Sequence, residues 1–154
     1  MFTLAEIIEL AVRIEENGEK TYRKAGQEVS DPELAAVLQW LADEEAEHRK
    51  WFPTLKEGLK SGQEDPRLAE MAKGVLQGVL GDQAFSIAEA DFSKMENLRQ
   101  LLALSIEFEK DTILFYEMLG AFIEEKTILE RLERIIEEEN RHVRTLEDYF
   151  HKRK

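Results

Sequence analysis

The sequence predicts an all-α protein in which four long helices pair as two antiparallel hairpins and form a four-helix bundle. Four stretches carry apolar residues at the three- and four-residue spacing of a helix with one buried face. Each stretch opens with a helix start signal, and a turn signal divides each half of the chain. A set of polar residues on the core-facing stripes recurs 94 positions later. We therefore expect one domain over residues 1–154.

The first hairpin is predicted over residues 3–57. Thr3-Leu4-Ala5-Glu6 has the pattern of a capping box and opens the first helix. Asp31 is a helix N-cap, and Pro32 suits the first position of the second helix. The predicted core-facing stripes are Leu4, Ile8, Ala11, Glu15, Gly18, Tyr22 and Ala25, followed by Leu34, Leu38, Leu41, Glu45, His48, Phe52 and Leu55.

Residues 58–92 are predicted to form a crossover, because this stretch is too long for a simple turn. Asp65-Pro66 could cap a short helix that runs through Leu80. A crossover of this length lets the chain travel the full length of the bundle before the second hairpin begins. A glycine-bearing crossover can also reach a second subunit, so we expect a homodimer.

The second hairpin is predicted over residues 93–151. Its helices open with two further capping boxes, Ser93-Lys94-Met95-Glu96 and Thr127-Ile128-Leu129-Glu130. The turn between them is placed near Glu124-Glu125. The predicted core-facing stripes are Leu101, Leu102, Ser105, Glu109, Thr112, Tyr116 and Leu119, followed by Leu132, Ile135, Glu139, His142, Leu146 and Tyr149.

A metal-ligand pattern occurs twice on these stripes. Residues 45–48 and 139–142 are both Glu-x-x-His, and each is preceded by a glutamate 30 positions upstream. In an antiparallel hairpin both carboxylates then lie about 14 residues, or roughly 20 Å, from the turn. One such motif alone is more often a pair on a solvent-facing helix. Two copies on core-facing stripes predict four carboxylates and two imidazoles at one level, which suits a pair of iron or manganese ions.

Through these residues the sequence resembles the ferritin-like diiron-carboxylate superfamily, and within it the rubrerythrin-type domain without the rubredoxin module. The resemblance implies a ferritin-like bundle around two iron ions. It implies that the glutamate of each motif bridges both ions, that each upstream glutamate is a terminal ligand, and that each histidine binds one ion. The implied metal ligands are Glu15, Glu45, His48, Glu109, Glu139 and His142.

Several neighbouring residues carry further expectations. A tyrosine follows each upstream glutamate by seven positions, and we expect Tyr22 and Tyr116 to donate hydrogen bonds to ligand carboxylates. Gly18 suggests close packing over the site. Trp40 and Trp51 are interpreted as packing residues at helix or subunit contacts. Two more glutamates each precede a motif by one position, and exposure to solvent is the favoured interpretation over contact with a histidine. They are Glu44 and Glu138.

The chain departs from the family pattern at three points. Thr112 stands where rubrerythrins have a further carboxylate one turn after the third-helix ligand. Ala46 stands where bacterioferritin has a haem-ligating methionine. The chain has no cysteines. It therefore lacks the cysteine-ligated rubredoxin module, and we expect its electron donor to be a separate protein.

Three functions are compatible with this pattern. The first is a non-haem diiron oxidoreductase that reacts with hydrogen peroxide or O2. The second is a ferroxidase or iron-handling protein without peroxidase turnover, and the third is a structural or partner-binding bundle with vestigial ligands. Manganese in place of iron stays open, because the ligand set suits both metals.

Composition excludes other functional classes. The absence of cysteine excludes disulfides, thiol catalysis and zinc–thiolate sites. A net charge of −12 argues against nucleic acid or an anionic membrane as partner. The N-terminus lacks the basic-then-apolar layout of a signal peptide, and no apolar run is long enough to span a membrane. We therefore expect a cytoplasmic protein.

Overall fold

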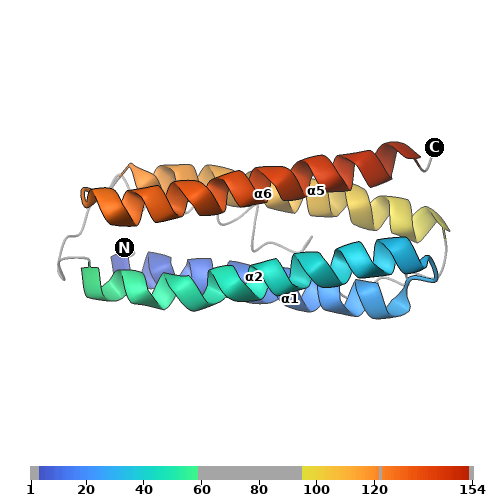
Figure 1. The fold of residues 1–154 in the computed structure, drawn as a ribbon, viewed down its shortest axis with the longest axis horizontal. Helices are drawn as coiled ribbons and strands as arrows, with labels where there is room; N and C mark the ends of the chain where they lie inside the picture. The colour runs from blue at the N-terminus through green and yellow to red at the C-terminus, as the bar shows by residue number, and fades with distance from the viewer. Residues whose placement is uncertain (1–3, 59–94, 122, 153–154) are drawn as a thin grey trace.

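The computed structural model describes residues 4–58, 95–121 and 123–152, which form four long helices (Figure 1). The helices are α1 (Leu4–Glu28), α2 (Pro32–Gly58), α5 (Met95–Gly120) and α6 (Lys126–Lys152). These parts of the chain contain no strand. The predicted all-α fold is therefore confirmed. The crossover and its short helix lie outside the described residues, apart from the last residue of α2.

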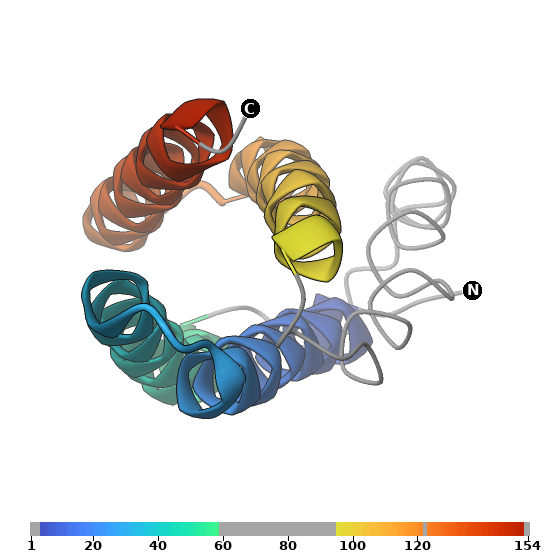
Figure 2. The same ribbon diagram turned by 90° about the vertical axis from the view of Figure 1, so that its right-hand side faces the viewer.

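The helices pair as two antiparallel hairpins, α1 with α2 and α5 with α6. Figure 2 shows the bundle end-on, with α6 beside α2 and α5 beside α1. The end of α2 and the start of α5 lie at opposite ends of the bundle (Figure 1). The second hairpin therefore begins at the opposite end of the bundle from where the first hairpin ends, as the length of the predicted crossover requires.

The turns between the paired helices test the predicted start signals. Oδ1 of Asp31 accepts hydrogen bonds from the backbone N–H groups of Glu33 at 3.0 Å and Leu34 at 3.5 Å, which confirms the N-cap of α2. The predicted cap at Thr127 is wrong. Because α6 already begins at Lys126, Thr127 lies within its first turn. The predicted caps at Thr3 and Ser93 lie outside the described residues.

The apolar core is divided into two clusters along the bundle. One is built from residues that precede the predicted ligands on α1 and α6 and follow them on α2 and α5, and it includes Phe52 and Phe115. The other is built from residues that follow the predicted ligands on α1 and α6 and precede them on α2 and α5, and it includes Leu38 and Leu102. Each predicted core-facing position is buried wherever its side chain is described. The predicted ligands therefore lie mid-helix, between two apolar layers that keep water out.

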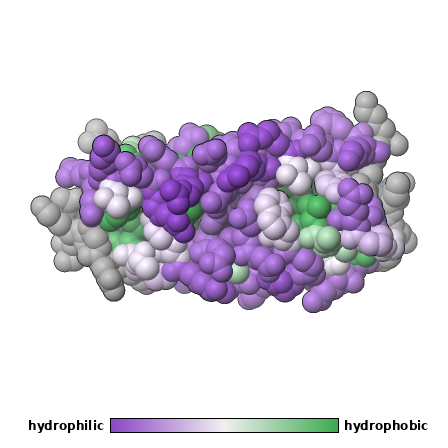
Figure 3. Space-filling view, in the orientation of Figure 1, coloured by the Kyte–Doolittle hydropathy of each residue, from purple (hydrophilic) through white to green (hydrophobic). Residues whose placement is uncertain are grey.

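The outer surface is mainly hydrophilic. The face shown in Figure 3 carries only small, separate hydrophobic areas. Among the described residues, two large apolar side chains are exposed, Trp40 at 44% and Leu114 at 56%. None of the described helices has a stretch long and apolar enough to cross a membrane.

Candidate metal centre

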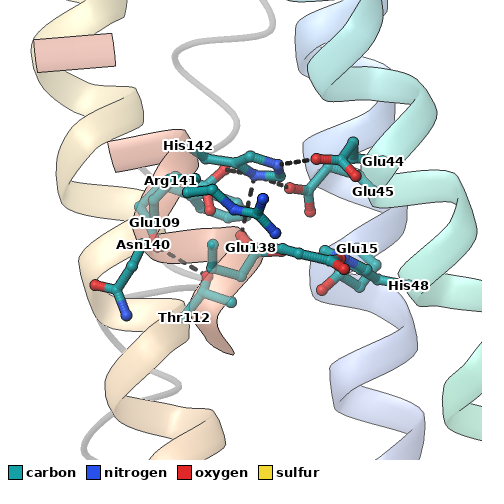
Figure 4. Close-up of polar contacts among 12 residues, drawn as sticks. Glu15, Glu44, Glu45, His48, Glu109, Thr112, Glu138, Asn140, Arg141 and His142 are labelled. Carbon is teal, nitrogen blue, oxygen red and sulfur yellow. Dashed lines mark hydrogen bonds and ion pairs between the residues drawn. The ribbon is translucent and has the colours of Figure 1, made fainter. Parts of the chain in front are cut away.

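The six predicted ligands converge in the middle of the bundle, and all four helices contribute; Figure 4 labels five of the six. Their burial is almost complete: His48 is 3% exposed, and Glu15, Glu45, Glu109, Glu139 and His142 are 0% exposed. Taking several carboxylates out of water costs several kcal/mol each unless cations or hydrogen bonds compensate. The stripes identified from the sequence thus place all six side chains at one point.

Two overlapping groups of four residues have ligand atoms close enough to surround a cation. Each group contains Glu45 and Glu139, together with one upstream glutamate and one histidine. The two groups are Glu15, Glu45, His48 and Glu139, and Glu45, Glu109, Glu139 and His142. The structure thus has two adjoining groups of potential ligands that share two carboxylates.

The polar atoms of these residues lack the partners that buried groups normally have. In the described part of the chain, eight buried side-chain nitrogen and oxygen atoms have no hydrogen-bond partner, and the six predicted ligands hold all eight. They include both carboxylate oxygens of Glu45 and Glu139 and Nδ1 of both histidines. Buried polar atoms without partners are rare in native proteins and mark a missing ion or a functional group. Six oxygens and two imidazole nitrogens suit a pair of iron or manganese ions.

Both histidines point Nδ1 into the centre. Nδ1 of His48 lies 2.7 Å from Oε1 of Glu139 and 3.6 Å from Oε2 of Glu15. Nδ1 of His142 lies 3.1 Å from Oε1 of Glu45 and 3.8 Å from Oε1 of Glu109. Each imidazole thus offers the same nitrogen to the shared centre.

The other ring nitrogen of each histidine contacts a glutamate of the opposite hairpin. Nε2 of His48 lies 2.5 Å from Oε2 of Glu138, and Nε2 of His142 lies 3.1 Å from Oε1 of Glu44 (Figure 4). An ionised carboxylate only accepts hydrogen bonds, so Nε2 carries a proton and Nδ1 is the nitrogen left for a metal. The preference for exposed Glu44 and Glu138 side chains is wrong, because both are partly buried against the histidines.

The two predicted tyrosines also bond across the hairpins. The Tyr22 hydroxyl donates to Oε1 of Glu109 at 2.6 Å, and the Tyr116 hydroxyl donates to Oε1 of Glu15. Burial, followed by the charge of the accepting carboxylate, raises the pKa of each phenol well above its usual value. Both hydroxyls therefore stay protonated and orient one oxygen of each upstream glutamate.

Gly18 lets Glu45 approach the backbone of α1. A Cβ atom at this position would lie 3.1 Å from Oε2 of Glu45 and 3.3 Å from its Cδ atom. Such contacts are tighter than ordinary van der Waals packing, so the shared carboxylate fits here because the side chain is absent. At the equivalent position of the other hairpin, Thr112 is fully buried, and its hydroxyl donates to the backbone carbonyl of Phe108 at 2.8 Å.

Without cations, the centre holds protons. Burial alone lowers the pKa of His48, but the neighbouring carboxylates of Glu139 and Glu15 raise it to about 11. The pKa of His142 is raised in the same way. Burial and the charge of Glu139 raise the pKa of Glu109 to about 8. Protons occupy atoms that a metal would use, so protons and metal ions compete for this centre.

Substitution of the two tyrosines tests their role. Tyr22→Phe and Tyr116→Phe each remove a hydroxyl that orients a ligand carboxylate, and we expect Fe(II) affinity to fall by about tenfold in each. Anaerobic titration against a competing chelator measures this. Tyr149→Phe is the matched control, because it removes a tyrosine–glutamate hydrogen bond, 3.0 Å to Glu33, away from the centre. Equal affinities in all three variants would contradict the prediction.

One contact of the centre was not expected from the sequence. The exposed indole of Trp40 lies edge-on against the ring of His142, with ring centroids 5.5 Å apart. The interpretation of Trp40 as a packing residue at helix or subunit contacts does not include this contact with a predicted ligand. No spacing rule identifies this contact, because it joins α2 to α6 across the two hairpins.

Comparison with known proteins identifies a family and a fold for this chain. A family model described as Rubrerythrin matches residues 6–150. The fold is similar to the crystal structure of a candidate ferritin-like diiron-carboxylate protein from Thermotoga maritima, with a TM-score of 0.73 and 20% sequence identity. That match covers 99% of this chain and 97% of the other. No curated protein matches the chain.

Proposed function

Since this chain belongs to the rubrerythrin family, we propose that it is a non-haem diiron oxidoreductase that reacts with hydrogen peroxide or O2. One observation carries the proposal. All eight buried side-chain atoms that lack a partner in the described residues belong to two groups of potential ligands that share two carboxylates. A structural bundle has no use for such a cluster, because the same volume filled by apolar side chains is usually at least as stable.

The proposal assigns a role to each of the six residues. Glu45 and Glu139 would help to hold both ions, because both residues belong to both groups. Glu15 with His48, and Glu109 with His142, would each complete one ion's coordination. When bound, reduced iron supplies the electrons that cleave the O–O bond of the oxidant.

The remaining contribution of the chain is positioning and exclusion of water. The glutamates that accept from Nε2 hold both imidazoles in the tautomer that leaves Nδ1 free for the metal. The tyrosines hold one oxygen of each terminal carboxylate, and the second oxygen, Oε2 of both Glu15 and Glu109, remains without a partner. The two apolar clusters on either side keep the centre dry, which strengthens electrostatic interactions inside it.

Stopped-flow mixing of anaerobically loaded protein with each oxidant tests this function. We expect about two Fe(II) ions per chain and faster oxidation by peroxide than by O2. Glu47→Gln is a suitable control, because this glutamate lies within the motif of α2 but is exposed and contacts Lys50. An oxidation rate no greater than that of free Fe(II) would refute the oxidoreductase.

A second candidate is a ferroxidase or iron-handling protein, and one cluster favours it. Glu44, His48 and Glu138 form a further group with ligand atoms close together, and the two glutamates are partly exposed. Carboxylates between solvent and a buried centre suit the passage of cations inward. Iron uptake well beyond two ions per chain would favour this candidate, whereas rapid turnover of peroxide at constant iron content would favour the first.

The proposal extends to metal identity and partners. Iron is the proposed metal, and elemental analysis of freshly purified protein distinguishes it from manganese. Because the chain has no cysteine, the electron donor is proposed to be a separate protein. A homodimer and a cytoplasmic location remain predictions, and size-exclusion chromatography tests the first of them.

A further inference from the structure

Trp40 joins the surface of the bundle to the candidate centre. Its side chain is 44% exposed, whereas the ring of His142 that it contacts is completely buried. The rings meet edge to face, with a centroid separation of 5.5 Å and an interplanar angle of 77°. This is the separation of aromatic rings in direct contact. An aromatic side chain open to solvent is thus one contact away from a predicted ligand.

The aromatic contact continues inside the centre. The rings of His142 and His48 are stacked, with centroids 6.1 Å apart and an interplanar angle of 21°. Trp40, His142 and His48 therefore form a continuous series of rings from the surface to both predicted metal positions. Because the rate of electron transfer through protein falls steeply with the gap between groups, rings in contact favour transfer over saturated side chains.

The two halves of the centre differ in the aromatic contacts of their histidines, although their predicted ligands are the same. The residue 94 positions after Trp40 is Arg134, which is exposed. Among the described residues, no ring except that of His142 contacts His48. The 94-residue repeat that relates the predicted ligands therefore does not extend to this position. The first half of the chain has an indole there, and the second half has a charged side chain.

We propose that Trp40 is the residue through which electrons from a separate one-electron donor protein enter the metal centre. This inference rests on the proposed diiron oxidoreductase. Each transfer oxidises one donor molecule and reduces one ferric ion held at the centre, and two transfers restore the reduced pair. Trp40 is only a relay, so it ends each transfer in its starting state.

The two tryptophans of the chain provide a matched experiment. Trp40→Phe keeps an aromatic ring, Trp40→Leu removes it, and Trp51→Phe is the control. Trp51 lies on the same helix and is half-buried, and its ring packs against Phe52, at a centroid separation of 5.1 Å, rather than against a histidine of the centre. Phe52 contacts Tyr116, so this second series of rings reaches the centre only through the hydrogen bond from Tyr116 to Glu15. Metal content and Fe(II) affinity are measured first, and they are expected to equal those of the parent in all three variants, because none of these substitutions removes a predicted ligand or one of the hydrogen bonds that orient the ligands.

Reduction kinetics then test the relay. Oxidised, iron-loaded protein is mixed anaerobically with reduced ferredoxin as the probe, and loss of the ferric absorbance is followed. We expect a rate about tenfold lower in Trp40→Leu, equivalent to roughly 1.4 kcal/mol in activation free energy. Trp40→Phe should fall between Trp40→Leu and the parent, and Trp51→Phe should equal the parent. Oxidation of reduced protein by peroxide should be the same in all four proteins.

Fluorescence provides a readout independent of turnover. In Trp51→Phe the only indole is Trp40, and ferric loading should quench most of its emission relative to the metal-free protein. In Trp40→Phe the remaining Trp51 should be quenched much less.

Equal reduction rates in all variants, or equal quenching of both indoles, would overturn the relay. If the same proteins are still oxidised by peroxide, the proposed oxidoreductase function is not affected. Failure of the loaded parent to react with peroxide or O2 would instead refute the function and the relay together.

Discussion

Glu45→Gln and Glu139→Gln are each expected to weaken binding strongly at both metal positions, whereas Glu15→Gln and Glu109→Gln should weaken it at one position each. The difference follows from the geometry, because the first two residues belong to both groups of ligands and the others to one. Binding free energies of about 10–16 kcal/mol, as found for structural zinc sites with four ligands, make one ligand worth roughly 2.5–4 kcal/mol. Affinity at an affected position should therefore fall by about two to three orders of magnitude.

Anaerobic titration with Fe(II), followed by elemental analysis after desalting, measures the number of ions retained. Glu47→Gln again serves as the control, since it removes an exposed glutamate two positions after Glu45. If Glu45→Gln lost only one ion, or if all four ligand variants lost the same fraction, the shared-carboxylate arrangement would be wrong.

Metal removal is expected to destabilise the protein strongly. An ion present at a thousand times its dissociation constant stabilises the folded state by about 4 kcal/mol. Two ions should therefore raise the melting temperature by more than about 10 °C for a chain of this size. Thermal unfolding of chelator-treated protein, before and after anaerobic reloading with Fe(II) or Mn(II), measures the shift.

The variant Glu45→Leu distinguishes the loss of stabilisation by metal from a low intrinsic stability of the bundle. Burial, followed by the charges of Glu109 and Glu139, raises the pKa of Glu45 well above its usual value, so this carboxylate is costly in the metal-free protein. Glu45→Leu should stabilise the metal-free protein by about 1–4 kcal/mol. It should also remove the response to added metal. A melting temperature that does not change on metal removal in the parent would favour the structural bundle.

The sequence was sufficient to predict which polar side chains are buried together at the candidate centre, because the information lies within single helices and in one repeat. Glu45 and His48 are three positions apart on a core-facing stripe, and the same pair recurs at residues 139 and 142. Helical periodicity determines which face of each helix is buried. The equal spacing from each turn determines that the predicted ligands of paired helices lie at the same height along the bundle. Both are local properties, so they do not require knowledge of how the hairpins pack.

The outer contacts of the centre required the structure. A glutamate one position before a ligand lies about 100° away around the helix, at the edge of the buried stripe. Whether Glu44 is solvated or contacts His142 depends on how closely α2 approaches α6, which no periodicity describes. The 94-residue relation between Glu44 and Glu138 was the available signal, since exposed residues have no reason to repeat. The predicted N-cap at Thr127 was wrong for another reason. A capping sequence pattern inside the first turn of a helix looks the same as one just before the helix begins.

Every hydrogen bond that orients a ligand side chain in this centre runs from one hairpin to the other. Tyr22 reaches Glu109, Tyr116 reaches Glu15, and each histidine reaches a glutamate of the opposite pair. Neither hairpin alone contains a complete binding site. Two separate polypeptides, one per hairpin, would therefore associate far more tightly with metal than without it, and the assembly would report the concentration of the free ion.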